Sequence, residues 1–423
     1  MIRANDPNLK SWVDVSGNSD FPIQNIPFGI FSLKDSSPRL GIAIGDYVVD
    51  LSVLADLGYF DEMKLDLSIF SSDSLNAFIG SGQEVWRGVR DRISQLLDSE
   101  NEELRDQAEH REKALVNRAD VSMLMPVRIR DYTDFYSSIE HATNVGTMFR
   151  DPDNALLPNW KHLPVGYHGR ASSIIVSGED IIRPKGQTKA DDADAPSFGP
   201  TNLLDFELEI GFITGKSNPL GQNISTAEAE DHIFGMVLMN DWSARDVQKW
   251  EYVPLGPFLA KSFASSISPW IVTLDALDPF RVAGPKQETA VLPYLEYEGD
   301  KNFDIELEVQ IQPENGEATT VCNSNFKYMY WNMAQQLAHQ TINGCNVDVG
   351  DMYASGTISG HTADSYGSML ELAWKGTKPI TLKDGSERKF ILDGDSVIMK
   401  GHSEKNGVRI GFGEVRAKVL PAL

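Results

Sequence analysis

The segment FELEIGFITG, from Phe206 to Gly215, constrains the fold of this chain more than any other. Successive side chains of a β-strand point to opposite faces, so a strand here separates two sets of residues. One set is wholly apolar: Phe206, Leu208, Ile210 and Phe212. The other begins with two acids and then turns small or apolar: Glu207, Glu209, Gly211 and Ile213. Both faces therefore favour burial, and the two carboxylates need a compensating charge.

A second Glu-Leu-Glu segment, Glu306–Glu308, has a different context. The face that carries Glu306 and Glu308 continues with Gln310 and Gln312, so it is polar throughout. In each segment the alternation of a strand places the two carboxylates roughly 7 Å apart. We expect the second pair to lie in water and the first pair to be buried.

A divalent cation is the natural compensation for Glu207 and Glu209. Carboxylate oxygens without neighbouring Cys or His favour Ca²⁺ or Mg²⁺ over zinc, and Ca²⁺ takes further oxygen ligands. Asp241 ends the apolar strand IFGMVLMN and is one further candidate, and Asp134 is another. An aspartate at a strand end is also a frequent cap of the following helix, so both interpretations of Asp241 stand at this point.

The stretch DYTDFYSSIEHATNVGTMFR, from Asp131 to Arg150, is unusually rich in groups that transfer protons or bind ions. It has no sustained apolar period of 3.6 or 2.0 residues, which favours a loop. Binding and catalytic groups concentrate on loops that a rigid scaffold supports. We therefore expect a functional loop here, with these polar members: Asp134, Tyr136, Glu140, His141 and Arg150.

Length and patterning indicate two domains in a mainly β chain with some α structure. Residues 1–119 combine β-rich runs around a tight turn at Gly45-Asp46, a helix, and a charged helix or linker over residues 101–118. The helix is predicted from the spacing of Val85, Val89, Ile93 and Leu96. Residues 120–423 are rich in strands. Short helices are expected after the Ser225–Glu228 capping box, over Ser243–Trp250 and from Trp331.

Charge and composition exclude several classes of function. The formal net charge is −23, and so acidic a surface repels phosphate backbones, which makes nucleic acid an improbable partner. No stretch approaches the roughly 18 apolar residues of a membrane helix. The N-terminus has no secretory or transit character, so the expected location is cytoplasmic.

Cys322 and Cys345 have no metal-ligand spacing, and we expect two buried free thiols.

Several longer motifs together resemble the fumarylacetoacetate hydrolase family. They lie between Asp131 and Lys378 and read DYTDFYSS, HATNVG, LPVGYHGRASS, FELE, NDWSARD, WEYVPLGPFL, GTISG and GSMLEL. The resemblance implies a homodimer whose chains have a small N-terminal β-barrel domain and a larger C-terminal β-sandwich roll. It also implies metal-dependent hydrolysis of a carbon–carbon bond in 4-fumarylacetoacetate, giving fumarate and acetoacetate, the last step of tyrosine and phenylalanine breakdown.

The resemblance further implies a role for each matching residue. The ligands of Ca²⁺ or Mg²⁺ are Asp134, Glu207, Glu209 and Asp241, with a second cation near Lys261 and Ser265. Water is activated by His141 with Glu371. The developing negative charge is stabilised by Arg245, Gln248 and Lys261. The dianionic diketo acid is held by Tyr136, Arg150, Tyr167, Tyr252 and Thr357.

These residue types suit the chemistry. The imidazole of a histidine titrates near neutral pH, at about 6.5, and a carboxylate partner such as Glu371 fixes its tautomer. Arg245 and Gln248 are three residues apart, so one helical turn places them on the same face. An ion pair of Arg245 with Asp241 or Asp246 is the plainer alternative. Arg150 suits a substrate carboxylate because the guanidinium binds carboxylates through two bonds.

The chain also departs from the family pattern. Ile139-Glu140 stands where the family usually has Arg-Gln, Ser265 replaces a usual Thr, and the loop HTADSYG after Gly360 is its own version. Two rivals lie within the superfamily, an acylpyruvate hydrolase and an oxaloacetate decarboxylase. A Ca²⁺-binding β-sandwich used for adhesion is a rival of another class, but it would have no use for His141 and Glu371.

Overall fold

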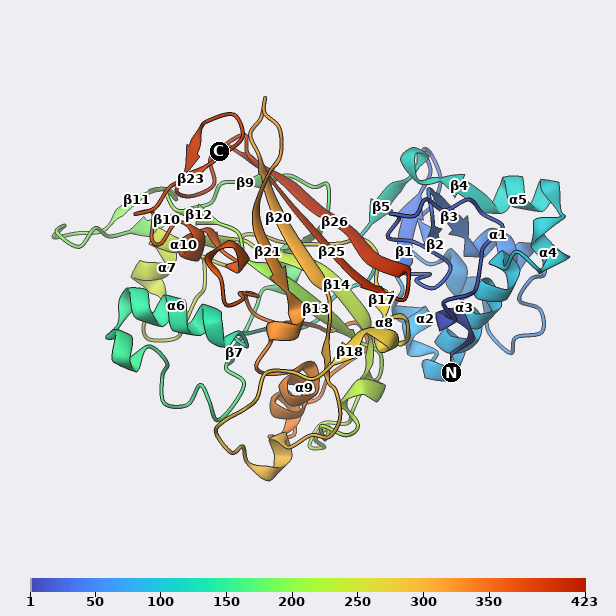
Figure 1. The fold of residues 1–423 in the computed structure, drawn as a ribbon, viewed down its shortest axis with the longest axis horizontal. Coiled ribbons are helices and arrows are strands. Elements are labelled where there is room, and N and C mark those ends of the chain that lie inside the picture. The colour runs from blue at the N-terminus through green and yellow to red at the C-terminus, as the bar shows by residue number, and fades with distance from the viewer. Residues whose placement is uncertain (1) are drawn as a thin grey trace.

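The computed structural model describes residues 2–423, and it is mainly β with some α structure, as predicted (Figure 1). The N-terminal part contains a five-stranded antiparallel sheet in the order β4-β3-β2-β1-β5. The division at residue 120 and the barrel and sandwich-roll descriptions stay predictions. The N-terminal strands are β1 (Phe28–Ser32), β2 (Arg39–Ile44), β3 (Tyr47–Asp50), β4 (Leu115–Asn117) and β5 (Ser122–Leu124).

The predicted hairpin and the predicted helix of the N-terminal part are confirmed. β2 and β3 form a hairpin around Gly45-Asp46, and Gly45 has a φ of +54°, a conformation that glycine adopts without strain. The spacing-based helix buries Val89, Ile93 and Leu96. The charged segment over residues 101–118 forms two short helices, but its last part, Leu115–Asn117, is strand β4, so the prediction of a helix or linker is wrong there. The helices are α1 (Leu51–Asp56), α2 (Asn76–Gly80), α3 (Gln83–Leu97), α4 (Glu102–Arg105) and α5 (Ala108–Ala114).

An eight-stranded sheet forms the centre of the molecule, in the order β7-β6-β22-β13-β14-β16-β8, with β17 pairing beside β14. Its two longest strands, β13 and β14, are antiparallel neighbours, and β6 runs parallel to β22. The strands are β6 (Tyr132–Phe135), β7 (Gly166–His168), β8 (Ile174–Val176), β13 (Leu208–Thr214), β14 (Ile233–Asp241), β16 (Ser265–Ile267), β17 (Val272–Thr273) and β22 (Met352–Ala354).

Both faces of this sheet are covered, because alternate residues of β14 belong to two different cores. Leu238 lies in the core that contains Val309 of a second, five-stranded sheet, and Met239 lies in the core that contains Phe28 of the N-terminal part. The second sheet has the order β21-β20-β25-β26-β9 (Figure 1). Its strands are β9 (Ile181–Ile182), β20 (Glu306–Gln312), β21 (Thr319–Asn325), β25 (Ser396–Lys405) and β26 (Val408–Leu420).

Short elements connect the two sheets. A short 3-10 helix, Ala229–His232, precedes β14, as predicted, and Ser225 Oγ donates to Glu228 Oε2 at 2.6 Å. Ser225 does not cap this helix, because Glu228 occupies its N-cap position. The remaining helices are α6 (Ile139–Phe149), α7 (Arg245–Glu251), α8 (Leu274–Leu277), α9 (Met333–Thr341) and α10 (Met369–Leu372). The remaining strands are β10 (Lys185–Thr188), β11 (Ser197–Pro200), β12 (Leu204–Asp205), β15 (Ser243–Ala244), β18 (Arg281–Val282), β19 (Asn302–Phe303), β23 (Ile380–Thr381) and β24 (Glu387–Arg388).

The prediction of a loop over residues 131–150 is wrong. The stretch contains strand β6 and the 11-residue helix α6. Ser138 begins the helix, since its Oγ accepts the backbone N–H of His141 at 3.1 Å. The buried face of α6 carries His141, Ala142 and Gly146 instead of large apolar residues, so the helical period is absent from the sequence.

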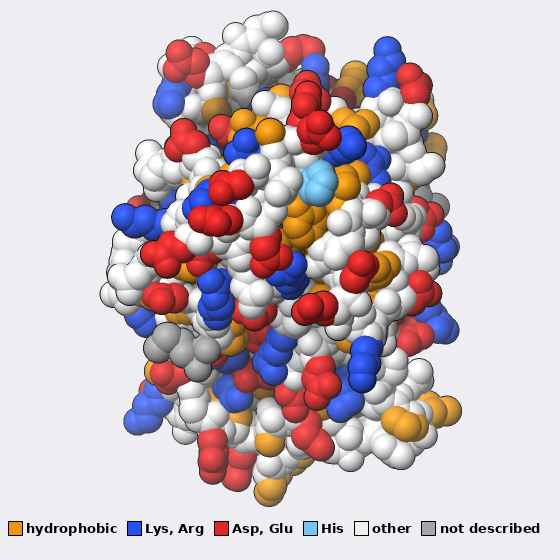
Figure 2. Space-filling model, turned by 90° about the vertical axis from the view of Figure 1, so that its right-hand side faces the viewer, with side chains coloured by type: hydrophobic (Ala, Val, Ile, Leu, Met, Phe, Trp, Pro, Cys, Tyr) orange, Lys and Arg blue, Asp and Glu red, His pale blue; other side chains and the backbone are white. Residues whose placement is uncertain are grey.

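The surface carries charges of both signs, and both cysteines are free. The face in Figure 2 carries acidic and basic side chains intermixed. Within residues 2–423, no helix combines the length and apolar character needed to cross a membrane. Both cysteines are free thiols, and Cys322 is buried, but Cys345 is only half-buried. The prediction was wrong for Cys345 because it lies in the turn just after α9, which runs over the surface.

Candidate active site

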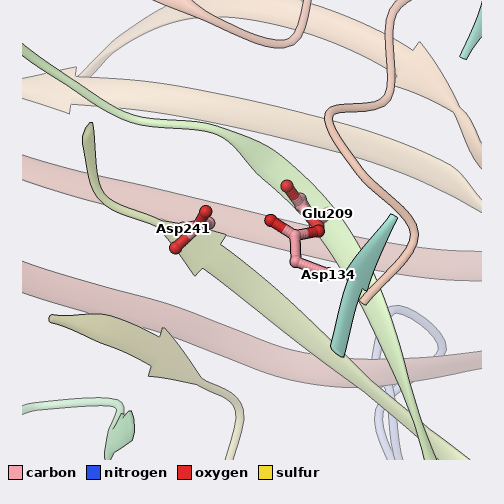
Figure 3. Close-up of side chains that lie close together, drawn as sticks. All are labelled: Asp134, Glu209 and Asp241. Atoms are coloured by element: carbon pink, nitrogen blue, oxygen red, sulfur yellow. The ribbon is translucent and has the colours of Figure 1, made fainter. Parts of the chain in front are cut away.

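Three carboxylates from three strands of the central sheet converge at one point. They belong to Asp134 on β6, Glu209 on β13 and Asp241 at the end of β14, and one oxygen of each lies within 4.8 Å of the other two. Figure 3 shows the side chains of Asp134 and Glu209 close together, with Asp241 opposite. All three are at least 98% buried. Among the described residues, Asp134 Oδ1 and Glu209 Oε1 have no hydrogen-bond partner.

The electrostatics of this cluster fit a hard divalent cation. Burial raises the pKa of Asp134 and of Glu209 well above the usual carboxyl range, and the neighbouring acids raise both further. A cluster with this composition is unfavourable when ionised unless a cation balances it. The available ligands are all oxygens, which suits Ca²⁺ or Mg²⁺. The residues present therefore fit the kind of metal that the sequence predicted.

Glu207 lies outside this triad of carboxylates, although the sequence predicted it as a ligand. Its Oε2 accepts a hydrogen bond from Lys261 Nζ, and its Oε1 lies 2.6 Å from a terminal guanidinium nitrogen of Arg245. Burial disfavours the charge of Glu207, but Lys261 and Arg245 outweigh burial and lower its pKa to about 2. Glu207 is therefore an ionised carboxylate whose charge two cationic side chains already balance.

Asp241 connects the triad to Lys261 and Ser265. Its Oδ2 accepts from Lys261 Nζ at 2.6 Å and from the Tyr167 hydroxyl at 3.2 Å, and its Oδ1 accepts from Ser265 Oγ at 2.8 Å. Helix α7 has Ala244 as its N-cap residue, so the alternative interpretation of Asp241 as a helix cap is wrong. The second cation predicted near Lys261 and Ser265 stays a prediction.

His141 and Glu371 form a buried pair, with 2.7 Å between His141 Nδ1 and Glu371 Oε2. His141 is 3% exposed and Glu371 is 1% exposed. Three further donors fix the Glu371 carboxylate at 2.8–3.0 Å: Asn144 Nδ2, Ser359 Oγ and Ser368 Oγ. Burial opposes its charge, but the imidazole and these donors prevail, so the pKa of Glu371 lies below its usual value.

Arg245 and Gln248 lie on one face of α7, as the spacing predicted, and Arg245 donates to Gln248 Oε1 at 3.2 Å. The alternative ion pair of Arg245 with Asp241 or Asp246 is wrong. Arg245 Nε instead donates to Asp205 Oδ2 at 2.8 Å, and Asp246 accepts the backbone N–H of Asn202 at 2.8 Å. The pairing differs because Asp205 is fully buried beside Arg245.

The five residues predicted to hold substrate are dispersed between the centre and the surface. The Tyr136 ring meets the His141 ring edge-on, with 5.1 Å between centroids. Tyr167 reaches Asp241, as described above. Arg150 is exposed at the end of α6, where it donates to the Ala155 carbonyl at 2.8 Å. Tyr252 is 52% exposed, and Thr357 is 2% exposed.

Gly356 joins the GTISG segment to the carboxylate triad. Its backbone N–H donates to Glu209 Oε2 at 2.9 Å, and its φ is +79°. A Cβ at this position would lie 2.3 Å from the Phe135 carbonyl oxygen. Only glycine therefore permits the close approach that orients Glu209.

Sequence reasoning missed several polar groups in the site. Ser368 and Glu371 have the S-x-x-E spacing of a capping box, which would have identified Ser368. Asn144 lies three residues after His141 and therefore on the same helical face. Tyr132 has a buried hydroxyl without a partner among the described residues, and no sequence signal distinguishes it. Asp205 precedes Glu207 by two positions, and the strand alternation would have included it.

Glu140, next to His141, interacts with the loop that is particular to this chain. Its Oε1 lies 2.9 Å from His361 Nδ1, and its Oε2 is buried without a partner among the described residues. Burial raises the pKa of Glu140 above its usual value, His361 lowers it, and nearby Glu371 raises it. Glu140 therefore holds its proton more tightly in the folded protein than in the unfolded chain.

The shift of Glu140 predicts a pH-dependent effect of Glu140→Gln. A raised folded-state pKa contributes stability that is complete below the unfolded pKa and is lost as pH rises through the folded pKa. Glutamine resembles the protonated acid, so the melting temperature of the variant relative to the parent should rise from pH 4 to pH 8. Thermal unfolding across this range measures the difference. A difference that does not change with pH would contradict the prediction. The matched control is Glu306→Gln, because Glu306 is exposed and also pairs with a histidine, His402.

The site and fold agree with comparisons to known proteins. A family model described as "Fumarylacetoacetate (FAA) hydrolase C-terminal" matches residues 131–420, and one described as "Fumarylacetoacetase N-terminal" matches residues 24–126. This protein is an enzyme, a hydrolase. The chain belongs to the fumarylacetoacetate hydrolase family.

Curated relatives lead to the same family, and a solved structure has the same fold. The fumarylacetoacetase of Dictyostelium discoideum is 56% identical over 421 residues, 98% of each chain. The human fumarylacetoacetase is 54% identical over 98% of this chain and 99% of its own. Among solved structures, the fumarylacetoacetate hydrolase of Exiguobacterium antarcticum is 19% identical with a TM-score of 0.53, covering 94% of this chain and 99% of its own. Its likeness supports the fold alone.

Proposed function

We propose that this enzyme hydrolyses 4-fumarylacetoacetate to fumarate and acetoacetate in tyrosine and phenylalanine breakdown. The single observation that carries the proposal is the buried His141–Glu371 pair, 2.7 Å apart, in a site that also contains the carboxylate triad and two cationic side chains. The curated relatives that share about half of its residues over nearly their whole length are named fumarylacetoacetases. Homodimerisation and the cytoplasmic location stay predictions.

His141 is the proposed general base. When the Nδ1–H group of His141 donates a hydrogen bond to Glu371, the lone pair of the ring lies on Nε2. Nε2 can then take a proton from water. The hydroxide equivalent bonds to the fumaroyl carbonyl carbon. The bond from that carbon to the adjacent methylene then breaks, and the electron pair leaves with the acetoacetate fragment. That fragment takes up one proton, so the net reaction consumes one water molecule.

Arg245, Gln248 and Lys261 are the proposed donors to the oxygen that becomes negative during attack. Arg245 and Lys261 are nine-tenths buried, so their positions are fixed before the reaction begins. One such preorganised donor contributes about 2.7–4 kcal/mol to catalysis. Glu207 pairs with both cationic side chains, Arg245 and Lys261, and holds them in place. This gives the carboxylate a role even though it lies outside the triad.

Asp134, Glu209 and Asp241 are the proposed ligands of a divalent cation, Ca²⁺ or Mg²⁺. Coordination by Glu207, whose charge Lys261 and Arg245 balance, stays a prediction. When bound, such a cation supplies Lewis-acid stabilisation of enolate oxygens and orients a diketone. A solved relative of the fold, maleylpyruvate hydrolase from Sphingobium sp. SYK-6, is described in complex with manganese (II) ion and pyruvate; it is 14% identical with a TM-score of 0.50, and covers 94% of this chain and all of its own.

Tyr136, Arg150, Tyr167, Tyr252 and Thr357 are the proposed substrate contacts. The two carboxylates of the substrate need cationic or hydroxyl partners, and Arg150 offers two parallel N–H groups. Arg150 and Tyr252 are exposed to solvent, so both are accessible to an incoming substrate. The Tyr136 ring is packed against His141 and would border the reacting carbonyl.

Turnover of fumarylacetoacetate by the purified protein tests the proposal. With Ca²⁺ or Mg²⁺ supplied, we expect loss of the diketone absorbance and release of fumarate and acetoacetate in equal amounts. Acylpyruvates and oxaloacetate are the comparison substrates, since they distinguish the acylpyruvate hydrolase and the oxaloacetate decarboxylase of the same superfamily. A higher kcat/KM on either comparison substrate would overturn the assignment.

A further inference from the structure

Asp205 connects two parts of the site through three hydrogen bonds. Its Oδ2 accepts from Arg245 Nε at 2.8 Å and from the backbone N–H of Leu370 at 3.0 Å. Its Oδ1 accepts from the backbone N–H of Met369 at 2.7 Å. The residue has no exposed surface, so no water competes for these bonds. The carboxylate is therefore fully engaged between Arg245 and the start of α10.

The two partners of Asp205 carry different functions. Met369 and Leu370 are the first two residues of α10, and the next residue is Glu371, which orients His141. Arg245 begins α7 directly after strand β15, which pairs with β12 so that Asp205 faces Ser243. One rigid carboxylate thus sets both the position of the helix that carries Glu371 and the direction of the Arg245 guanidinium.

We propose that Asp205 is a positioning residue that sets the placement of Arg245 relative to the His141–Glu371 pair. Asp205 has no exposed surface and acts through those groups. The inference rests on the proposed function, because it assumes that Arg245 stabilises negative charge while His141 removes a proton. Sub-ångström placement of such groups governs the rate of a reaction more than the affinity for substrate.

Asparagine at position 205 would disturb this arrangement selectively. A carboxylate accepts bonds at both oxygens, whereas a carboxamide has one oxygen and an NH₂ group that only donates. Three donors converge on Asp205, so in either orientation of the amide at least one of them would face the NH₂ group. Arg245 or the start of α10 must then move.

Asp395 provides a matched control. It is 2% exposed and also accepts three hydrogen bonds, from Arg388 Nε at 2.7 Å, from an Arg388 terminal nitrogen at 2.9 Å and from the backbone N–H of Leu392 at 2.9 Å. It contacts none of the residues assigned to the site. Asp395→Asn therefore removes a similar buried Asp–Arg pair and should lower the melting temperature comparably without a selective loss of rate.

The experiment measures kcat and KM of both variants on fumarylacetoacetate with saturating metal. We expect Asp205→Asn to lower kcat about 10- to 100-fold with KM changed less than about threefold, and Asp395→Asn to keep kcat within about twofold. In an Arg245→Ala background, adding Asp205→Asn should lower kcat by a smaller factor than it does in the parent, since the part of its effect that acts through Arg245 is already lost. Equal kcat for the two asparagine variants, or fully additive losses, would overturn the proposal.

A second variant covers the case in which Asp205→Asn does not fold. Asp205→Glu keeps the charge but extends it by one methylene, so it should also lose kcat with little change in KM; parental kcat in this variant would overturn the proposal. The two hypotheses fail separately. An inactive parent protein defeats the proposed function, whereas an active parent with a fully active Asp205 variant defeats only the role of Asp205.

Discussion

Replacing His141 with alanine is expected to lower kcat by about 10²–10⁴-fold, the usual contribution of a general base. The reason is that no other described side chain offers an imidazole next to Glu371. KM should stay within a few-fold, because His141 is not one of the groups proposed to hold the substrate carboxylates. Metal content should be unchanged, since His141 is not part of the carboxylate triad. Steady-state kinetics and elemental analysis of one preparation measure all three quantities.

Stability and activity can be separated in this experiment. His141→Ala leaves the buried Glu371 without its imidazole partner, and an incompletely satisfied buried charge costs about 1–3 kcal/mol. Adding Glu371→Gln removes that charge, so the double variant should regain stability but not activity. Loss of bound metal in His141→Ala, or retention of more than a tenth of the parental kcat, would place the base elsewhere.

Much of the carboxylate cluster was predictable because the alternation of a strand is a strong local constraint. The contrast between the apolar flanks of Glu209 and the polar flanks of Glu308 separated a buried acid from a half-buried one, and Glu306 of the second pair is exposed as predicted. The same alternation extends two residues earlier to Asp205, yet its partners come from α7 and α10, about 40 and 165 residues away. Such long-range partners have no signature in a local pattern.

The polar stretch after Asp131 shows where a local pattern fails to predict even the secondary structure. Its helix, α6, was not predicted because the buried face holds His141 beside small residues, and function there replaces the apolar residues that reveal a helix. Its cap, Ser138, was visible only once the helix was known. Glu140 likewise had no interpretation until the fold brought His361 within 2.9 Å of it.

Removing one carboxylate of the triad is expected to have the second large effect. Glu209→Gln should lower metal occupancy at least tenfold and reduce kcat by more than about 10²-fold, because Glu209 Oε1 has no protein partner among the described residues that would otherwise hold it. The matched control is Glu308→Gln in the other Glu-Leu-Glu strand, where the carboxylate is bonded to Gln310 and Thr320 on the surface side. Elemental analysis after gel filtration measures occupancy.

Thermal stability provides an independent readout for the same variant. In chelator, Glu209→Gln should be at least as stable as the parent, because burial and the neighbouring acids disfavour the charge of Glu209 and an amide carries none. With metal at about 100 times its dissociation constant, the parent gains about 2.7 kcal/mol of stability and the variant gains little. The order of melting temperatures therefore reverses between chelator and metal. If the parent is not stabilised by Ca²⁺ or Mg²⁺, or if Glu209→Gln is stabilised equally, then Asp134, Glu209 and Asp241 do not form a metal site.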